Sequence, residues 1–239
     1  MEVHAHTYTE RKKWTHYLWE FLMLFLAVFC GFLAEYQLEH TIEHNKEKEY
    51  MRSMIEDLAQ DTIEINRVVA VLINNNKNND SLLNLLELPG TKNFEQVKKL
   101  YLLHFSSIGA EMTSFSQRTI SQLKNSGGMR LIRKKVVADS ITLYDNNEQY
   151  FAAIIKSYDE GSTAAFNAGS VIFDNRYIRH NFYGEKVLLL TYDENVLRKY
   201  ANYIFVFQMI GGYYKNFLIY QKTFSIELMS LIKKEYHLK

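Results

Sequence analysis

Two histidines have the most specific metal-binding spacing in the chain. His40 and His44 stand four residues apart, so on a helix they share one face and their imidazoles can hold one metal ion. Glu43 or Glu47 would supply a carboxylate ligand. Because no third histidine has an evident place beside them, we favour a solvated or interfacial pair and predict no bound metal and no cofactor.

A dense basic cluster follows a pair of glycines. Gly127 and Gly128 favour a tight reversal, because glycine takes left-handed dihedrals without strain. A helix N-terminus beyond the turn would add backbone N–H groups for an anion or an acidic partner segment. We favour a solvated helix face and a structural glycine turn over that anion or partner site. The cluster consists of Arg130, Arg133, Lys134 and Lys135.

No pattern of catalytic residues accompanies these clusters. The sequence lacks a Ser/His/Asp order, a phosphate-binding glycine loop, a paired-carboxylate signature and a dinucleotide fingerprint. The only cysteine, Cys30, lies within an apolar run. Lys and Arg number 28 against 27 Asp and Glu, so no net field favours nucleic acid. We therefore predict a protein that is not an enzyme and binds no nucleic acid.

One segment near the N-terminus is apolar enough to cross a bilayer. Residues 17–34 read YLWEFLMLFLAVFCGFLA, with Glu20 as the one charge, and as a helix they span about 27 Å. Trp14, Trp19 and Tyr36 stand near the ends, where aromatic rings favour the headgroup layer. We predict an N-terminal arm over residues 1–13, a transmembrane helix over 14–38 and a water-exposed domain over 39–239.

Basic residues beside this segment predict its orientation. Arg11, Lys12 and Lys13 precede it directly, and such residues stay on the cytoplasmic side. The arm is then cytoplasmic, the helix lies in a bacterial inner membrane, and the domain is periplasmic. Ala27 and Gly31 form a small-xxx-small pair that lets two such helices approach closely, which predicts self-association in the bilayer.

The rest of the chain reads as helices. Apolar residues recur at alternating three- and four-residue steps, and Pro89 is the only proline. We predict an all-α, antiparallel bundle of four or five main helices continuous with the membrane helix. The first half is expected to contain a first helix to about Ile73, a polar linker over 74–80 and helices over 81–88 and 93–109. A helix opened by a Ser114/Gln117 capping box and a long helix from Met129 should follow. The remainder should contain a loop over 174–185, a buried loop or short strand over 187–190, and a C-terminal helix opened by a Thr191/Glu194 capping box.

Two stretches carry a family resemblance. Residues 117–150 (QRTISQLKNSGGMRLIRKKVVADSITLYDNNEQY) and 46–61 (KEKEYMRSMIEDLAQD) resemble a family of small single-pass membrane proteins of unknown function that is common in Bacteroidetes. The stretch AEYQLEH (34–40) departs from the asparagine- and tryptophan-rich sequence typical of that family. The resemblance implies an inner-membrane anchor and an exported helical domain, and it implies no activity.

These features favour a membrane-anchored helical module without enzymatic activity. The expected role is an accessory or protein-interaction subunit of an envelope complex, with the lipid bilayer and another envelope protein, or a second copy, as partners. The alternative is a sensor-like domain that binds a small ligand within the bundle and works with a membrane partner.

Overall fold

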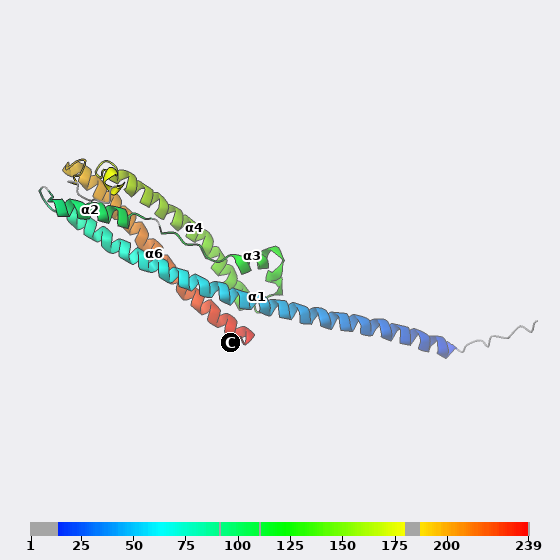
Figure 1. The fold of residues 1–239 in the computed structure, drawn as a ribbon. Helices are drawn as coiled ribbons and strands as arrows, with labels where there is room; N and C mark the ends of the chain where they lie inside the picture. Colours follow the sequence, from blue (N-terminus) through cyan, green and yellow to red (C-terminus); the bar gives the residue numbers. More distant parts are fainter. Residues whose placement is uncertain (1–13, 91, 110, 180–186, 239) are drawn as a thin grey trace, which may run out of the picture. The chain divides into compact units, whose positions relative to one another are not determined.

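The computed structural model of the chain describes residues 14–90, 92–109, 111–179 and 187–238. Every regular element within these residues is a helix, which confirms the all-α prediction. The elements are α1 (Trp14–Glu87), α2 (Phe94–Ser107), α3 (Arg118–Asn125), the short 3-10 helix η1 (Gly128–Leu131), α4 (Lys135–Gly169), α5 (Arg176–Arg179) and α6 (Glu194–Tyr236). Figure 1 labels α1 to α4 and α6.

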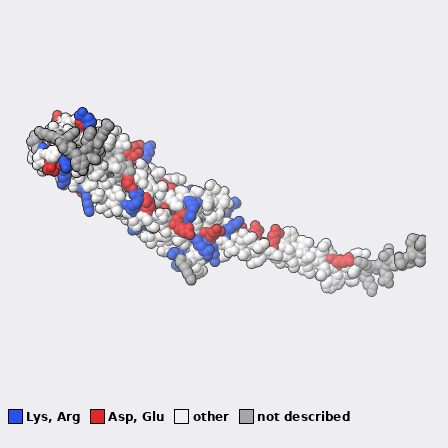
Figure 2. Space-filling view, in the orientation of Figure 1, with Lys and Arg blue, Asp and Glu red and all other residues white. Residues whose placement is uncertain are grey.

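The chain divides into two compact units, one ending at Glu49 and one beginning at Tyr50, and α1 runs through both. Helix α1 is the one helix in the described residues that is long and apolar enough to cross a membrane, and its apolar part, none of which is buried, lies in the first unit. White surface dominates this stretch in Figure 2, with red atoms at a few acidic positions. Arg11, Lys12 and Lys13 lie outside the described residues.

The predicted linker at 74–80 is wrong, because α1 continues through it to Glu87. Asn75 and Asn79 are buried, and the side chain of Asn75 hydrogen-bonds to the Tyr158 hydroxyl. The side-chain amide of Gln208 donates to Asp80 Oδ1 at 2.6 Å. The helix therefore continues through this polar stretch because α4 and α6 supply partners for Asn75 and Asp80, which the polar composition alone did not indicate. The helix predicted over 81–88 is the last part of α1.

Aromatic contacts between α4 and α6 form much of the core of the second unit. Tyr158 stacks on Phe207 with ring centroids 4.9 Å apart, and Phe151 stacks on Phe217 at 5.1 Å. Gly211 is buried, and an added Cβ would lie 3.4 Å from the Tyr158 ring. Gly211 thus marks a close contact between α4 and α6, and α6 continues as a helix through Gly211 and Gly212. The apolar residues that recur at three- and four-residue steps along α1, α4 and α6 are predicted to form the core. They are buried or half-buried, except Tyr203 of α6, which is exposed.

Caps define the ends of two helices. Asn93 and Gln96 form a reciprocal capping box at the start of α2, which confirms that helix. The box predicted at Thr191 and Glu194 is wrong, because the Asp193 side chain caps α6 by accepting from the backbone N–H groups of the second and third helical residues. A carboxylate at this position also suits the positive end of the helix dipole.

The reversal after α3 takes place at the predicted glycines. Gly127 has φ 68° in the left-handed region, whereas Gly128 opens η1 with an ordinary φ. The next long helix begins at Lys135 and not at Met129, because Ile132 takes an extended conformation that buries its side chain in the core. Gly127 is therefore the position that requires glycine in this turn.

The segment 187–190 is a loop without strand structure, and only alternate side chains of it are buried. Val187 and Leu189 are buried, and the Leu190 backbone N–H donates to the Ile172 carbonyl at 2.8 Å. The loop predicted over 174–185 contains the short helix α5, and its residues 180–185 lie outside the described part of the chain.

Gly169 and Gly212 provide a test of the helix contacts. A Cβ at Gly169 would lie 2.3 Å from His104 Cε1, whereas one at Gly212 would meet nothing within 4 Å. Thermal unfolding of Gly169→Ala should show a loss of about 1–3 kcal/mol from overpacking. Gly212→Ala should gain up to about 1 kcal/mol, because alanine favours helix. Equal melting temperatures for the two variants would contradict this arrangement.

Candidate functional site

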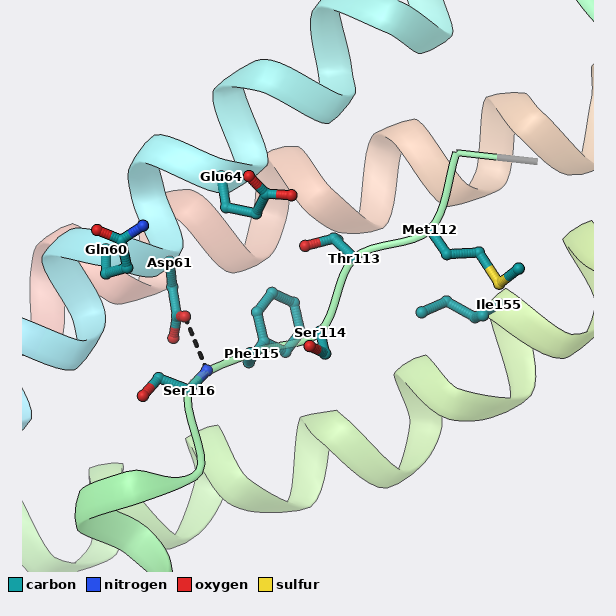
Figure 3. Close-up of a pocket in the computed structure, with 9 residues that line it drawn as sticks. All are labelled: Gln60, Asp61, Glu64, Met112, Thr113, Ser114, Phe115, Ser116 and Ile155. Atoms are coloured by element: carbon teal, nitrogen blue, oxygen red, sulfur yellow. Dashed lines mark hydrogen bonds between the residues drawn. The ribbon is translucent and has the colours of Figure 1, made fainter. Parts of the chain in front are cut away.

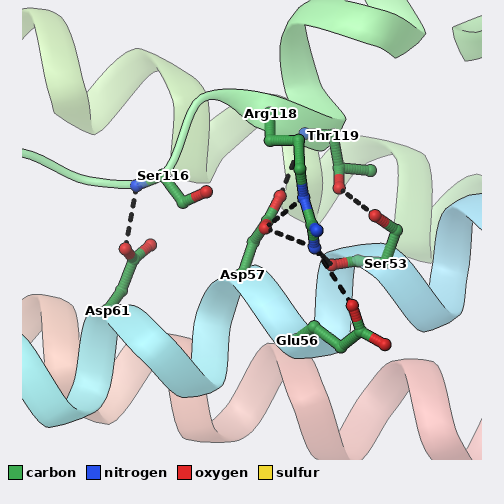
Figure 4. A network of polar contacts seen from close by, with 7 residues as sticks. All are labelled: Ser53, Glu56, Asp57, Asp61, Ser116, Arg118 and Thr119. Atoms are coloured by element: carbon green, nitrogen blue, oxygen red, sulfur yellow. Dashed lines mark hydrogen bonds and ion pairs between the residues drawn. The ribbon is translucent and has the colours of Figure 1, made fainter.

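A polar network joins α1 to the segment that leads into α3 (Figure 4). Asp57 is buried on α1, and its carboxylate accepts from Arg118 Nε at 3.0 Å and from the Thr119 backbone N–H at 2.9 Å. Ser53, one turn earlier on the same face, accepts a hydrogen bond from the Thr119 hydroxyl at 2.8 Å. Asp57 therefore caps the start of α3 from another helix.

This cap replaces the one predicted from sequence. Helix α3 begins at Arg118, and Gln117 makes no side-chain capping bond, so the predicted Ser114/Gln117 capping box is wrong. The apolar residues around this box, Phe115, Ile120 and Leu123, which the sequence predicts to face inward, are all buried. The apolar pattern thus located the packing face of this region, although the cap comes from a residue about sixty positions earlier.

Asp61 lies one turn after Asp57 and is also buried. Its carboxylate accepts from the Ser116 backbone N–H at 2.8 Å and from the Tyr144 hydroxyl at 2.6 Å. Burial raises the pKa of Asp61 above its ordinary value, and the nearby Asp57 charge adds to this, whereas the bonds from Tyr144 and Ser116 oppose it. Burial also raises the pKa of Tyr144, so the phenol stays protonated and donates.

A groove opens beside Asp61, where the segment 112–116 passes between α1 and α4 (Figure 3). Its volume is about 580 Å³. Gln60, Asp61 and Glu64 line it from α1, and Ile155 lines it from α4. Arg67 pairs with Glu64 at 2.7 Å and also with Glu111, which lowers the pKa of Glu64. The groove offers carboxylate, amide and hydroxyl groups to a small polar ligand.

His104 forms a second buried polar site. Its Nδ1 shares a 2.6 Å hydrogen bond with the Tyr200 hydroxyl, and its ring stacks on Phe173 with centroids 4.3 Å apart. Burial lowers the pKa of His104 to about 4. The imidazole is therefore neutral at pH 7, and its role at that pH is to join α2 to α6 and to the segment after α4.

The basic cluster lies on the surface at the start of α4. Its four residues are exposed, and Lys134 Nζ lies 3.6 Å from Glu235 Oε2. The guanidinium of Arg130 lies beside Gly127, where an added Cβ would be 3.1 Å from Arg130 Nη2. Lys134 precedes α4 without a side-chain capping bond. Binding of an anion or a partner by Arg130, Arg133, Lys134 and Lys135 remains a prediction.

The two histidines of the possible metal pair make local contacts on α1. The His40 ring meets Tyr36 edge-on with centroids 4.4 Å apart, and His44 Nδ1 lies 3.5 Å from Glu47 Oε2. Among the described residues, no group of three or more His, Cys, Asp or Glu side chains is arranged to hold a metal ion.

The small residues of the apolar segment lie on an open helix surface. Ala27 and Gly31 are exposed, and a Cβ added at Gly31 would meet nothing within 4 Å. A second helix therefore has access to this part of α1. Its self-association remains a prediction.

Comparisons with family models, curated proteins and solved structures found no match for this chain.

Sequence reasoning missed the inward carboxylates and His104. Asp57 and Asp61 are four residues apart and alternate with the buried residues Met54 and Leu58, so the pattern contains a signal that both face inward. His104 has a similar signal, because it falls four residues after the buried Leu100. Neither pattern identifies the residues that hydrogen-bond to these side chains, because those residues come from distant parts of the chain.

Two substitutions of Asp61 separate its hydrogen bonds from its charge. The raised pKa means that the charged carboxylate costs stability at neutral pH and that this cost disappears on acidification. Asp61→Asn keeps an acceptor for Ser116 and a polar partner for Tyr144, so its unfolding free energy at pH 7 should equal or exceed that of the parent. Asp61→Ala should lose about 1–3 kcal/mol, because it leaves both partners unsatisfied. Denaturant unfolding at pH 7 measures both, and equal losses in the two variants would refute the assignment.

His104 should give the domain an acid-sensitive stability. An unfolded chain binds a proton at this residue below about pH 6.5, whereas the folded chain does so only near pH 4. Stability should therefore fall by about 3 kcal/mol as the pH decreases through this window. His104→Phe should flatten the fall, while the exposed His237→Asn should leave it unchanged. Denaturant unfolding between pH 4 and pH 7 tests this, and parallel curves for all three proteins would contradict it.

Proposed function

We propose that the chain is a single-pass membrane protein without enzymatic activity whose helical domain serves as an interaction subunit of an envelope complex. The observation that carries the proposal is α1 itself. Its apolar part exposes large side chains throughout, whereas from Met51 onward the same helix buries a regular apolar stripe in the domain core. A bilayer is the environment that suits the first part, because it removes the exposed apolar surface from water.

The domain on this anchor is an antiparallel helical bundle on the periplasmic side. Contacts between α4 and α6 support the antiparallel arrangement. Along α4 from Asn147 through Phe151 to Tyr158, the contacted residues of α6 run backward in sequence, from Gln221 through Phe217 to Phe207. The basic residues before the apolar segment support cytoplasmic placement of the N-terminus. The family resemblance of residues 46–61 and 117–150 agrees with this placement.

The alternative function is a small-ligand sensor. The groove beside Asp61 favours it, because 580 Å³ suits a small molecule and polar groups converge on the groove. We place the interaction role first, because both carboxylates of the groove already have partners within the protein. Asp61 holds Ser116 and Tyr144, and Glu64 pairs with Arg67.

Reporter fusions test the anchor and its orientation. A periplasm-dependent reporter fused after Lys239 should be active, and a cytoplasm-dependent reporter at the same position should be silent. Changing Arg11, Lys12 and Lys13 to Glu should reduce the periplasmic signal, because these residues set the orientation. The same change at Lys46 and Lys48 should have little effect, since they lie farther from the span. Activity of the cytoplasmic reporter in the parent would overturn the proposed export.

Purification in mild detergent tests the interaction role. The tagged full chain should recover a second envelope protein in a fixed ratio, and a chain with the opposite tag should be recovered if it self-associates. Recovery of the chain without any protein partner, together with a melting temperature that rises on addition of a periplasmic small-molecule fraction, would favour the sensor instead.

A further inference from the structure

One side of the domain exposes large apolar side chains on two adjacent helices. Six of them define what we term the α4/α6 face, and all six are exposed. No Asp, Glu, Lys or Arg occurs from Tyr203 to Tyr214, so the centre of the face is uncharged along α6. The six residues are Leu143 and Tyr150 of α4 and Val206, Met209, Tyr213 and Tyr220 of α6.

A groove of about 480 Å³ runs through this face between the two helices. Tyr150 and Tyr213 line it and project most, with 66% and 67% of their surface exposed. Phe217 and Ile210 form its half-buried floor, and the Phe217 ring contacts Tyr150 with centroids 5.9 Å apart. The face therefore carries both protruding aromatic rings and an apolar recess of a size that can receive one.

The area of the face matches one side of a stable interface. Each of the six residues exposes between 47% and 67% of its surface, so together they expose several hundred Å², which is of the order of the roughly 800 Å² that each partner buries in a standard complex. An apolar surface of this size in water favours burial against a second apolar surface.

We propose that the α4/α6 face is a homodimer interface, in which each copy inserts an exposed tyrosine into the groove of the other. A two-fold symmetric contact requires a self-complementary patch, and rings beside a recess provide one. The centre of the face carries no charge along α6, so two copies can meet there without repulsion between like charges. An acidic or basic partner would find no complementary charge at the centre of this face. This interface is separate from the predicted contact through Ala27 and Gly31, and it does not depend on the proposed envelope role.

Cysteine cross-linking tests which face two copies share. In full-length chain carrying Cys30→Ser, Met209→Cys and Tyr213→Cys place thiols on the α4/α6 face, and Lys99→Cys places an exposed thiol on α2 as the control. Oxidation in membranes should give a dimer of the chain with at least one of the first two variants, at a yield at least tenfold above Lys99→Cys. Equal yields, or cross-linking only to a different protein, would overturn the proposal.

Charge placement tests the energetics on the full chain in mild detergent. Tyr213→Glu should weaken dimerisation by about 100-fold, because it buries an unpaired charge. Tyr213→Phe should preserve the dimer, and so should Ile63→Glu, which adds the same charge at an exposed apolar residue of α1. Sedimentation velocity gives the association constant, and circular dichroism melting confirms that each variant is folded. A monomeric parent would overturn the proposal, as would a dimer that persists in Tyr213→Glu and is lost in Gly31→Leu.

Discussion

The packing of the second unit depends on how the non-helical segment between α2 and α3 satisfies its backbone polar groups. This segment runs between α1 and α4, where apolar neighbours would leave a buried N–H group unpaired at a cost of about 1–3 kcal/mol. Asp61 accepts from the Ser116 N–H, Asp57 accepts from the Thr119 N–H, and Ser162 of α4 donates to the Ile108 carbonyl. Side chains from α1 and α4 thus supply hydrogen-bond partners to backbone groups that no regular secondary structure satisfies.

The same requirement explains why buried carboxylates are retained on α1. A charged group in an apolar core is destabilising unless several partners compensate its lost hydration. Asp57 has Arg118 and a backbone N–H, and Asp61 has a phenol and a backbone N–H. Replacing either aspartate with an apolar residue would remove the acceptor and leave its hydrogen-bond donors unsatisfied. The two residues therefore belong to the fold, and we assign them no catalytic role.

Periodicity predicted the helices well and their ends poorly. The stripes of α4 and α6 face the core because three- and four-residue steps place them on one side, as with Tyr144 and Tyr214. The extension of α1 through residues 74–80 could not be predicted, because Tyr158 and Gln208 bind Asn75 and Asp80 from distant positions in the chain. The cap of α3 was missed for the same reason. For the site, the sequence located the Gly127 turn, while the partners of Asp61 and His104 depended on the tertiary arrangement.

The distribution of polar groups separates two sides of the domain. Where α3 and its preceding segment cross α1, charged groups of both signs gather on the surface, as Figure 2 shows, because irregular backbone there needs side-chain partners. Along α4 and α6 the backbone is satisfied within each helix, so the fold places no such demand on the outward side chains. Lysine and glutamate would serve there equally well for stability and better for solubility. Exposed tyrosine, valine and methionine at those positions are therefore not explained by folding of the single chain, and the proposed burial against a second copy would account for them.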